Sequence, residues 1–517
     1  MSSNNSDTAH YFTLPGYTWD CMLYKTRQEL ELLTDIDMYL FVEKGIRGGL
    51  SQICGKRRAH ANNKYIPTYD TSKPDSYLMM YDINNQYGLS MCQSLPYGGF
   101  EWTDKNIDVM SIAIDSTKGY ILEVDLEYPE CLHDLHKDLP FCPEHKSVNG
   151  SKIKKLMATL ENKYRYVIHY KNLQQALANG LKLIKVHRAL SFNQSPWLKP
   201  YIDLNTELRK KAKNEFEKNL YKLLNNAVFG KTMENTRKYC KVKLVSRWEG
   251  RYGAEAYISN PEFKTCTISD ENLVAIEMKK LEVKLNKPIY VGFSILDIAK
   301  ISIYDFHYAY MIKVFPDCTL LYTDTDSLTY ELHSDPYLVM RRDCHSHFDT
   351  SDYPPENIYN IPQVNKKVLG KMKDEYNGVP MTDFVGLRSK LYCTKVLSTR
   401  DKLSILREKL KLEDYSDQEI EQMILNSFTT KKAKGVKKSI IENEITFDDF
   451  IECLETFKEK SISQNLILSY NHEVYSVKQD KIELSPHDDK RYLLPGTYNT
   501  LPIGHYSIKN HNNMEID

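Results

Sequence analysis

The sequence predicts an α+β fold in which long helices stand beside short pairs of strands. Residues 206–229 and 294–314 contain neither glycine nor proline, so each segment predicts one long helix. Residues 320–332 predict two strands, because β-forming side chains flank a central Asp-Thr-Asp. Helices and strands do not alternate regularly, and no internal repeat is visible. This order favours α+β over a doubly wound parallel sheet.

The composition is that of a large globular protein. Of the 517 residues, 41% are hydrophobic and 27% charged, and the length is typical of three or four packed units or of one enzyme with subdomains. The eleven cysteines include no C-x-x-C pair, which favours a reducing compartment over a disulfide scaffold. No apolar run approaches the roughly 18 residues of a membrane span, and no secretory signal is visible, so we expect no membrane partner.

Positive charge is concentrated in three segments of a chain whose formal net charge is zero. Residues 152–188 hold nine Lys or Arg and one acid, and residues 207–241 hold ten Lys or Arg and four acids. Five lysines lie between residues 431 and 438 without an acid among them. Such sorting of charge suits contact with phosphates, although solvated helix faces would also account for any one segment.

Two carboxylates one residue apart, Asp324 and Asp326, form the sharpest local feature. On an extended chain they would point to the same side, a few ångström apart. Like charges this close repel unless a cation neutralises them, so the pair is a candidate for a divalent metal with oxygen ligands. The alternative is an ordinary exposed turn.

A third carboxylate, Asp82, favours the metal hypothesis. It follows the apolar strand predicted over residues 77–80 and precedes a turn at Gly88, so it could meet Asp326 across a sheet. Carboxylates from two strands can hold two Mg²⁺ ions about 3.5 to 4 Å apart, a geometry that activates a hydroxyl and stabilises a pyrophosphate leaving group.

The helix predicted over residues 206–229 carries a basic and aromatic face. At 100° per residue, Lys211, Lys218, Lys222 and Phe229 fall within about 20° of one line, and Asn226 lies roughly 60° from it. Such a face could hold a triphosphate with its lysines and stack a base pair on its ring. A solvated lysine stripe is the alternative.

Together and in this order, these segments resemble the polymerase portion of type-B DNA polymerases. The resemblance is nearest to the protein-primed branch of organellar, viral and Maverick/Polinton transposon enzymes, and it covers residues 11–506. Five motifs carry it: residues 45–49 resemble the Y-x-G-G element, 82–89 motif A, 222–230 motif B, 322–327 motif C and 390–392 the K-x-Y motif.

The resemblance implies a right-hand fold of palm, fingers and thumb with two insertions. The implied regions are a remnant of the exonuclease–polymerase junction (1–44), a first palm segment with motif A (45–100), a first insertion (101–195), fingers with motif B (196–233), a second insertion (234–290), a second palm segment with motif C and K-x-Y (291–397), and the thumb with the C-terminal region (398–517).

The resemblance also implies a DNA-directed DNA polymerase that uses two Mg²⁺ ions to join a dNTP to a primer 3′-hydroxyl. Asp82 and Asp326 would bind the metals with help from the Ile83 carbonyl, and Asp324 would support the second carboxylate. Tyr87 would lie under the incoming sugar and select deoxynucleotides. The other residues implied are Lys211, Lys218 and Lys222 at the triphosphate, Asn226 and Phe229 at the nascent base pair, and Gly48, Gly49, Lys390, Tyr392, Lys431, Lys432, Lys434, Lys437 and Lys438 on DNA.

The chain departs from the family pattern at three motif positions and at its start. Gln86 replaces a leucine of motif A, Ala227 a serine of motif B, and Phe229 a tyrosine, changes that could reduce activity. The segment ahead of Gly48 leaves no room for the proofreading exonuclease. The alternatives are a fragment of a longer polymerase, a truncated gene, or a separate polypeptide that carries the exonuclease. Template-primer DNA is the expected partner, with a priming protein as a second one, in the nucleus or at a cytoplasmic viral replication site.

Two other interpretations compete with this one. A DNA-binding transposon or viral remnant that no longer polymerises would fit the missing exonuclease, Gln86 and Ala227. Reverse transcription is weaker, because those enzymes have adjacent aspartates in motif C. A zinc site is not expected, since the spacing matches no standard finger. Its candidate ligands would be Cys131, His133, His136, Cys142 and His145.

Overall fold

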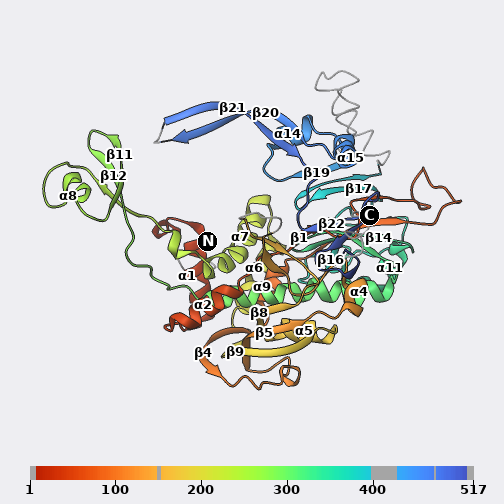
Figure 1. Cartoon of the computed structure of the whole chain (residues 1–517), viewed down its shortest axis with the longest axis horizontal. Helices are drawn as coiled ribbons and strands as arrows, with labels where there is room; N and C mark the ends of the chain where they lie inside the picture. The colour runs from red at the N-terminus through yellow and green to blue at the C-terminus, as the bar shows by residue number, and fades with distance from the viewer. Residues whose placement is uncertain (1–6, 148–152, 398–427, 471–472, 509–517) are drawn as a thin grey trace, which may run out of the picture.

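The computed structural model describes residues 7–147, 153–397, 428–470 and 473–508, and a ten-stranded mixed sheet lies at its centre (Figure 1). The sheet runs in the order β1-β13-β14-β3-β17-β18-β19, while β2, β15 and β16 pair off this path. Its strands are β1 (Ser51–Ile53), β2 (Arg58–His60), β3 (Tyr77–Ile83), β13 (Thr319–Asp324), β14 (Ser327–Leu332), β15 (Phe348–Asp349), β16 (Met372–Asp374), β17 (Met381–Arg388), β18 (Leu391–Val396) and β19 (Thr429–Ala433).

The two strands predicted around Asp-Thr-Asp are confirmed as the antiparallel hairpin β13–β14. On its other side β14 pairs with β3, so that Ser327 lies opposite both Asp324 and Asp82. The strand predicted to end at Met80 continues to Ile83, which places Asp82 inside the ladder. The three candidate carboxylates therefore come from one end of three neighbouring segments of the sheet.

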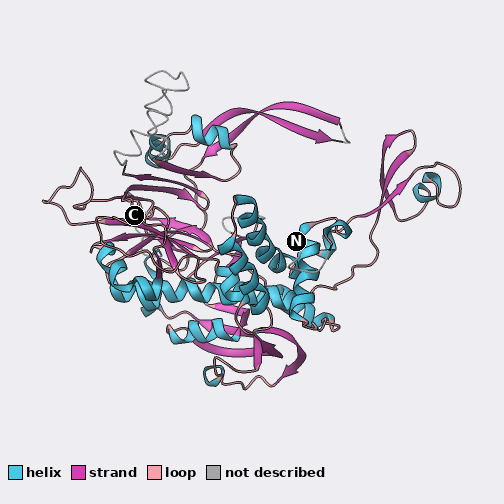
Figure 2. Cartoon of the chain, turned by 180° about the vertical axis from the view of Figure 1, so that it is seen from behind, coloured by secondary structure: helices cyan, strands magenta, loops and turns pink. Residues whose placement is uncertain are grey.

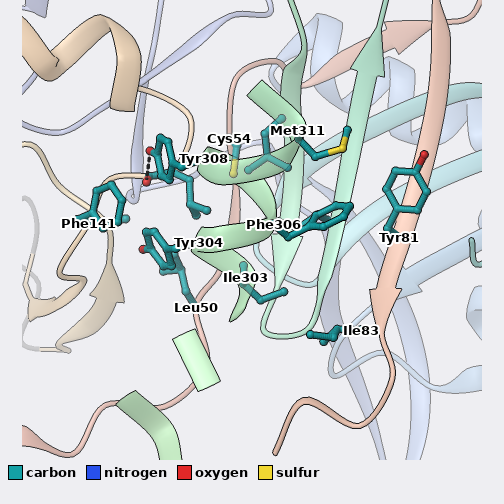
Figure 3. Close-up of a cluster of buried hydrophobic side chains, with 14 of the residues drawn as sticks. Leu50, Cys54, Tyr81, Ile83, Phe141, Ile303, Tyr304, Phe306, Tyr308 and Met311 are labelled. Atoms are coloured by element: carbon teal, nitrogen blue, oxygen red, sulfur yellow. Dashed lines mark hydrogen bonds between the residues drawn. The ribbon is translucent and has the colours of Figure 1, made fainter. Parts of the chain in front are cut away.

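A nearly completely buried helical run covers one face of this sheet. It consists of α9 (Ile289–Tyr304), a π-helical stretch (Asp305–Met311) and α10 (Ile312–Val314), which confirms the helix predicted over residues 294–314. Phe306 points from this run toward Tyr81 on β3, with ring centroids 5.9 Å apart (Figure 3). A helix that is apolar on all sides requires cover on all sides, and here it receives it from two sheets.

The second sheet belongs to the segment predicted as the first insertion and has the order β4-β9-β5-β8. It lies on the far side of α9 from the central sheet, as Figures 1 and 2 show from opposite directions. Its strands are β4 (Leu95–Thr103), β5 (Lys118–Glu127), β8 (Lys163–His169) and β9 (Lys182–Ser195). The same segment also contains α4 (His133–His136), α5 (Tyr170–Ala178) and the separate strand pair β6 (Glu144–Lys146) and β7 (Lys155–Met157).

Two further regions project from the body of the molecule (Figure 1). The segment predicted as the second insertion forms β10 (Lys241–Val245), α8 (Ala254–Ile258), β11 (Phe263–Asp270) and β12 (Leu273–Met278). The C-terminal region forms α14 (Lys438–Asn443), α15 (Phe447–Thr456), the long hairpin β20 (Lys460–Tyr470) and β21 (Glu473–Leu484), and the pair β22 (Arg491–Leu493) and β23 (Thr500–Pro502). The domain boundaries stay predictions, and residues 398–427 lie outside the described ranges.

The remaining helices lie around the motif segments and complete the mixed architecture. They are α1 (Leu14–Thr26), α2 (Ile36–Gly45), α3 (Gln86–Met91), α6 (Lys199–Lys211), α7 (Glu215–Thr232) and α11 (Pro336–His347). Among the described helices, none combines the length and the apolar character that a membrane crossing requires. Helices and strands in this irregular order confirm the α+β prediction.

The prediction of one long helix over residues 206–229 was wrong, because the chain breaks between α6 and α7. Asn214 is extended, and its side-chain oxygen accepts the amide proton of Glu217 at 2.8 Å. This side chain offers the backbone an N-cap in place of a continued helix. Lys211 ends α6 and therefore does not share a helix face with Lys218 and Lys222, contrary to the periodicity argument.

Removing the Asn214 cap should loosen the first turn of α7. Asn214→Ala is expected to cost about 1 kcal/mol locally, since the Glu217 amide loses its acceptor. Hydrogen exchange of peptides covering residues 215–218 should then accelerate about fivefold. Asn214→Asp keeps the acceptor and serves as the control, and equal exchange in the alanine variant and the native chain would contradict the capping role.

Candidate active site

Asp82 and Asp326 lie side by side at the end of the central sheet. Asp82 is opposite Ser327 in the β3–β14 ladder, and the Ile83 amide donates to the Asp326 carbonyl oxygen at 2.8 Å. Burial raises the pKa of Asp82 to about 8, and the negative charges of Asp326 and Glu375 add to this effect. Burial also raises the pKa of Asp326. The sheet therefore brings together the two carboxylates that the sequence predicts as metal ligands.

The Asp-Thr-Asp segment forms a tight turn, which corrects the expectation of an extended chain. Thr325 adopts φ 65°, and the Asp326 amide donates to the Asp324 carbonyl oxygen at 2.7 Å. A turn is required here because β13 and β14 are consecutive antiparallel strands. The two side chains consequently have different neighbours, and Asp326 rather than Asp324 stands beside Asp82.

Asp324 is held by Lys390, one of the residues expected on the primer. The Lys390 ammonium lies 2.5 and 2.7 Å from the two carboxylate oxygens of Asp324. Lys390 adopts φ 58° in the turn between β17 and β18, and its amide donates to the Tyr322 hydroxyl at 3.1 Å. The K-x-Y segment and motif C therefore form one polar network beside the metal candidates.

Gly49 lies against the motif C turn. A Cβ atom on Gly49 would come within 2.2 Å of the Thr325 Oγ1, and the Leu50 carbonyl oxygen accepts the Thr325 amide at 2.8 Å. Only glycine allows the backbone to approach the turn this closely. Gly48 is exposed, with open space where its Cβ would stand. The DNA contacts expected of both glycines stay predictions.

Tyr87 and Phe229 form a ring pair in front of the carboxylates. Tyr87 comes from α3 and Phe229 from α7, and their rings stack with centroids 4.6 Å apart and planes 16° apart. Lys222 and Asn226 lie exposed on the same helix as Phe229. The positive charge of Lys222 acts on both Asp82 and Asp326, where it opposes the rise of their pKa values.

Of the two other lysines expected at the triphosphate, Lys218 lies one turn before Lys222 on α7, and Lys211 lies on α6. Lys218 is paired with Glu215 one helical turn earlier, at 2.5 Å. Lys211 lies exposed at the end of α6, across the break. Of the three lysines, Lys222 is therefore the one whose charge acts on both carboxylates. A nucleotide contact of Lys211 and Lys218 stays a prediction.

Gln86 is accommodated in the interior. Its side chain is buried, and its Nε2 donates to the Ala299 carbonyl oxygen on α9 at 2.8 Å. A leucine could not make this bond, through which the glutamine links α3 to the buried helix, while its Oε1 is buried without a hydrogen-bond partner among the described residues. Ala227 is buried on α7, a helix that packs against α9.

The residues expected on DNA have mixed surroundings. Tyr392 is only 6% exposed, and its ring packs against Tyr322 at 4.6 Å between centroids. Lys431 donates to the carbonyl oxygens of Ile445 and Glu442, at 2.7 and 3.0 Å, and these bonds hold β19 to the segment around α14. Lys432, Lys434, Lys437 and Lys438 are exposed.

Sequence reasoning missed two charged residues beside Asp82. Lys373 lies opposite Asp82 in the β16–β3 ladder, and the amide of the nearby Glu375 donates to the Met80 carbonyl oxygen at 2.9 Å. Both charges act on Asp82, with opposite sign. The run Lys373-Asp374-Glu375 was a visible signal, but only the strand pairing shows that it adjoins motif A.

The donor chemistry of Asp82 and Asp326 fits a divalent cation, because a cation would relieve the repulsion between two half-buried carboxylates. Within the described ranges, no group of three or more His, Cys, Asp or Glu side chains could hold a metal ion. His136 lies instead in an aromatic cluster, where its Nδ1 is 2.8 Å from the Tyr128 hydroxyl and burial lowers its pKa to about 4.

Comparison with known proteins agrees with this geometry. Residues 4–311 match the family model described as DNA polymerase type B, organellar and viral. No curated protein matches the chain. Phi29 DNA polymerase complexed with primer-template DNA and incoming nucleotide is similar at 15% identity and TM-score 0.56, over 92% of this chain and 68% of that one. Phi29 DNA polymerase complexed with single-stranded DNA gives 15% identity and TM-score 0.53, over the same shares. This likeness confirms the predicted right-hand fold.

The raised pKa of Asp82 predicts a stability gain when this carboxyl is neutralised. An unfolded aspartate has a pKa near about 4, and that of Asp82 is about 8. Ionisation therefore penalises the folded state increasingly from about pH 4 to about pH 8, and constantly above. Without divalent cations, Asp82→Asn should raise the melting temperature at pH 9 by roughly 2 °C or more, and by less at pH 5.

The same melting temperatures, measured by scanning fluorimetry, should also respond to Mg²⁺. Mg²⁺ should raise the melting temperature of the native chain at pH 9 and have little effect on Asp82→Asn, because the variant lacks one anionic ligand. Asp317→Asn removes an exposed carboxylate just ahead of β13 and serves as the control. A lower melting temperature for Asp82→Asn at pH 9 would show that the Asp82 charge carries no penalty.

Proposed function

Since this chain belongs to the organellar and viral type-B DNA polymerases and is a DNA-directed DNA polymerase, we propose that it catalyses nucleotide transfer at Asp82 and Asp326. The primer 3′-hydroxyl would attack the α-phosphorus of a dNTP, and pyrophosphate would leave. The observation that carries the assignment is the β14–β3 ladder, which sets these two carboxylates side by side. Template-primer DNA is the partner on which such an enzyme acts.

Asp82 and Asp326 would hold two Mg²⁺ ions, with the Ile83 carbonyl oxygen as a further ligand. When bound, the ions supply charge neutralisation and lower the pKa of the attacking hydroxyl. Lys222 would neutralise the triphosphate, since its charge already acts on both carboxylates. Asp324 and Lys390 would fix the motif C turn through their ion pair.

The stacked rings of Tyr87 and Phe229 would form the floor of the nucleotide site. Because the Phe229 ring restricts the Tyr87 ring from one side, Tyr87 could not move away from a 2′-hydroxyl in that direction. Asn226 would border the nascent base pair from the same helix. The pair would therefore position the sugar and select deoxynucleotides.

One partner beyond DNA follows from the family branch. A priming protein would offer a Ser, Thr or Tyr hydroxyl in place of a primer terminus. This proposal rests on the similarity to protein-primed polymerases.

Loss of either metal carboxylate should abolish most primer extension. Asp82→Asn and Asp326→Asn are each expected to lower the rate by roughly 10²- to 10³-fold, because each removes negative charge that holds a cation. Asp317→Asn is the matched control. Full activity of either variant would refute the metal assignment, and an inactive native chain that still binds template-primer DNA would favour the DNA-binding remnant.

Opening the sugar site should admit ribonucleotides. Tyr87→Val removes the ring that stacks on Phe229 and should raise the incorporation of rNTP relative to dNTP by roughly 10- to 200-fold, the range of one lost steric contact. Tyr87→Phe keeps the ring and should keep the discrimination. Gel-based single-nucleotide extension measures both, and unchanged selectivity in Tyr87→Val would remove Tyr87 from this role.

A further inference from the structure

A cavity of about 150 Å³ lies behind the motif A turn, between fingers and palm. Asn84 and Asn85 of that turn line it, together with Arg209 of α6, Lys222 of α7 and the palm segments 349–352 and 366–373. None of its lining residues is aromatic, so it offers no surface on which a base could stack. Asp82, Tyr87 and Phe229 do not line it, whereas Lys222 does, so the cavity adjoins the proposed nucleotide site on the side of the triphosphate.

The wall of this cavity carries more positive than negative charge. Two acids, Asp349 and Asp352, line it together with five cations, which are Arg209, Lys222, the lysines Lys366 and Lys367 of the palm loop (residues 350–371), and Lys373 of β16. Within the part of the chain that the structure describes, only Lys373 among these five has an ion pair, with Asp352 at 2.6 Å.

Asp349, the buried acid of the cavity, already accepts three hydrogen bonds. Asp349 accepts the Asn84 side-chain amide at 2.6 Å and the Lys367 backbone amide at 2.8 Å through one oxygen, and the Ser351 amide at 3.0 Å through the other. These bonds hold the carboxylate in place, and its charge acts on Lys373, so Asp349 offsets only part of the positive charge of the cavity. A small polyanion would complete the balance of charge.

Arg209 provides an independent sign of a missing ligand. Its Nε is buried and has no hydrogen-bond partner among the described residues. An arginine donor buried without an acceptor is costly unless a ligand supplies one. Burial lowers the pKa of Lys367, and the neighbouring cations Arg209, Lys218 and Lys366 lower it further, which shows that these charges face one another.

The palm loop is tied to the motif A turn by its backbone. The Gly370 amide donates to the Asn84 carbonyl oxygen at 3.0 Å, and the Asn84 amide donates to the Lys371 carbonyl oxygen at 2.9 Å. Asn84 also donates through its side chain to the Val368 carbonyl oxygen at 3.2 Å. These bonds hold the loop that carries Lys366 and Lys367 against Asn84, which lies two residues beyond Asp82.

We propose that Arg209, Lys366 and Lys367 form a site for inorganic pyrophosphate, which receives the product as it leaves the metal centre. The inference rests on the proposed function, since nucleotide transfer is the step that releases pyrophosphate. Lys222 lines the cavity and also acts on Asp82 and Asp326, so it connects the two sites. The same diphosphate chemistry occurs in the β- and γ-phosphates of a bound dNTP, and the experiment separates the two sources.

Direct binding of inorganic pyrophosphate tests the site without catalysis. Isothermal titration of the full chain, without DNA or divalent cations, should show binding that weakens at least about tenfold in the double variant Lys366→Gln/Lys367→Gln. Lys213→Gln removes an exposed lysine from the nearby turn between α6 and α7 and should bind as the native chain does. The double variant Lys366→Arg/Lys367→Arg should retain binding, and its loss together with the glutamine variant would overturn the charge-based site.

Kinetics then separates product from substrate. In the glutamine double variant, the KM for pyrophosphate in pyrophosphorolysis should rise about tenfold, while the KM for dNTP changes less than about twofold. An equal rise in both would assign the cavity to the bound nucleotide and overturn the proposal, as would unchanged constants. Asp82→Asn should lose extension but keep pyrophosphate binding, so a failed metal assignment and a failed pyrophosphate site give different results.

Discussion

The antiparallel pairing of β14 with β3 is the interaction on which the candidate active site depends. Backbone hydrogen bonds fix Asp82 opposite Ser327, and this register leaves Asp326 no place except beside Asp82. The ladder thus buries both carboxylates, and this burial raises the pKa of each, with the negative charge of Asp326 adding to the effect at Asp82. A site that is strained without its cation is ready to bind one, because the scaffold has already fixed its geometry.

The fingers and the palm are coupled through a few contacts around the motif A turn. Gln86 reaches the carbonyl oxygen of Ala299 on α9, and Tyr87 stacks on Phe229 of α7. On the other side of the turn, Asn84 holds the palm loop that carries Lys366 and Lys367. One short segment thereby sets the position of the Tyr87–Phe229 ring pair, Asp82 and the basic cavity relative to one another.

Local pattern was sufficient for the elements that local geometry determines. The hairpin around Asp-Thr-Asp, the strand leading to Asp82 and the helical run after residue 294 were all predicted from residue types. The helix break at Asn214 was missed, because asparagine occurs both as an N-cap and inside helices. Residue type alone does not distinguish the two positions. The Asp324–Lys390 pair and the cavity were missed as well, since they arise where turns from distant regions of the chain meet.

The strand order of the central sheet also determines when the site can form during synthesis. β3 is made early, yet its partners β14, β16 and β17 all come from the second half of the chain. A nascent chain therefore carries the apolar edges of β3 unpaired until the ribosome has completed the hairpin that follows α10. Such non-local pairing is slow and leaves unpaired, aggregation-prone strand edges exposed. Chaperone binding to the early segment would therefore influence the yield of correctly folded chain.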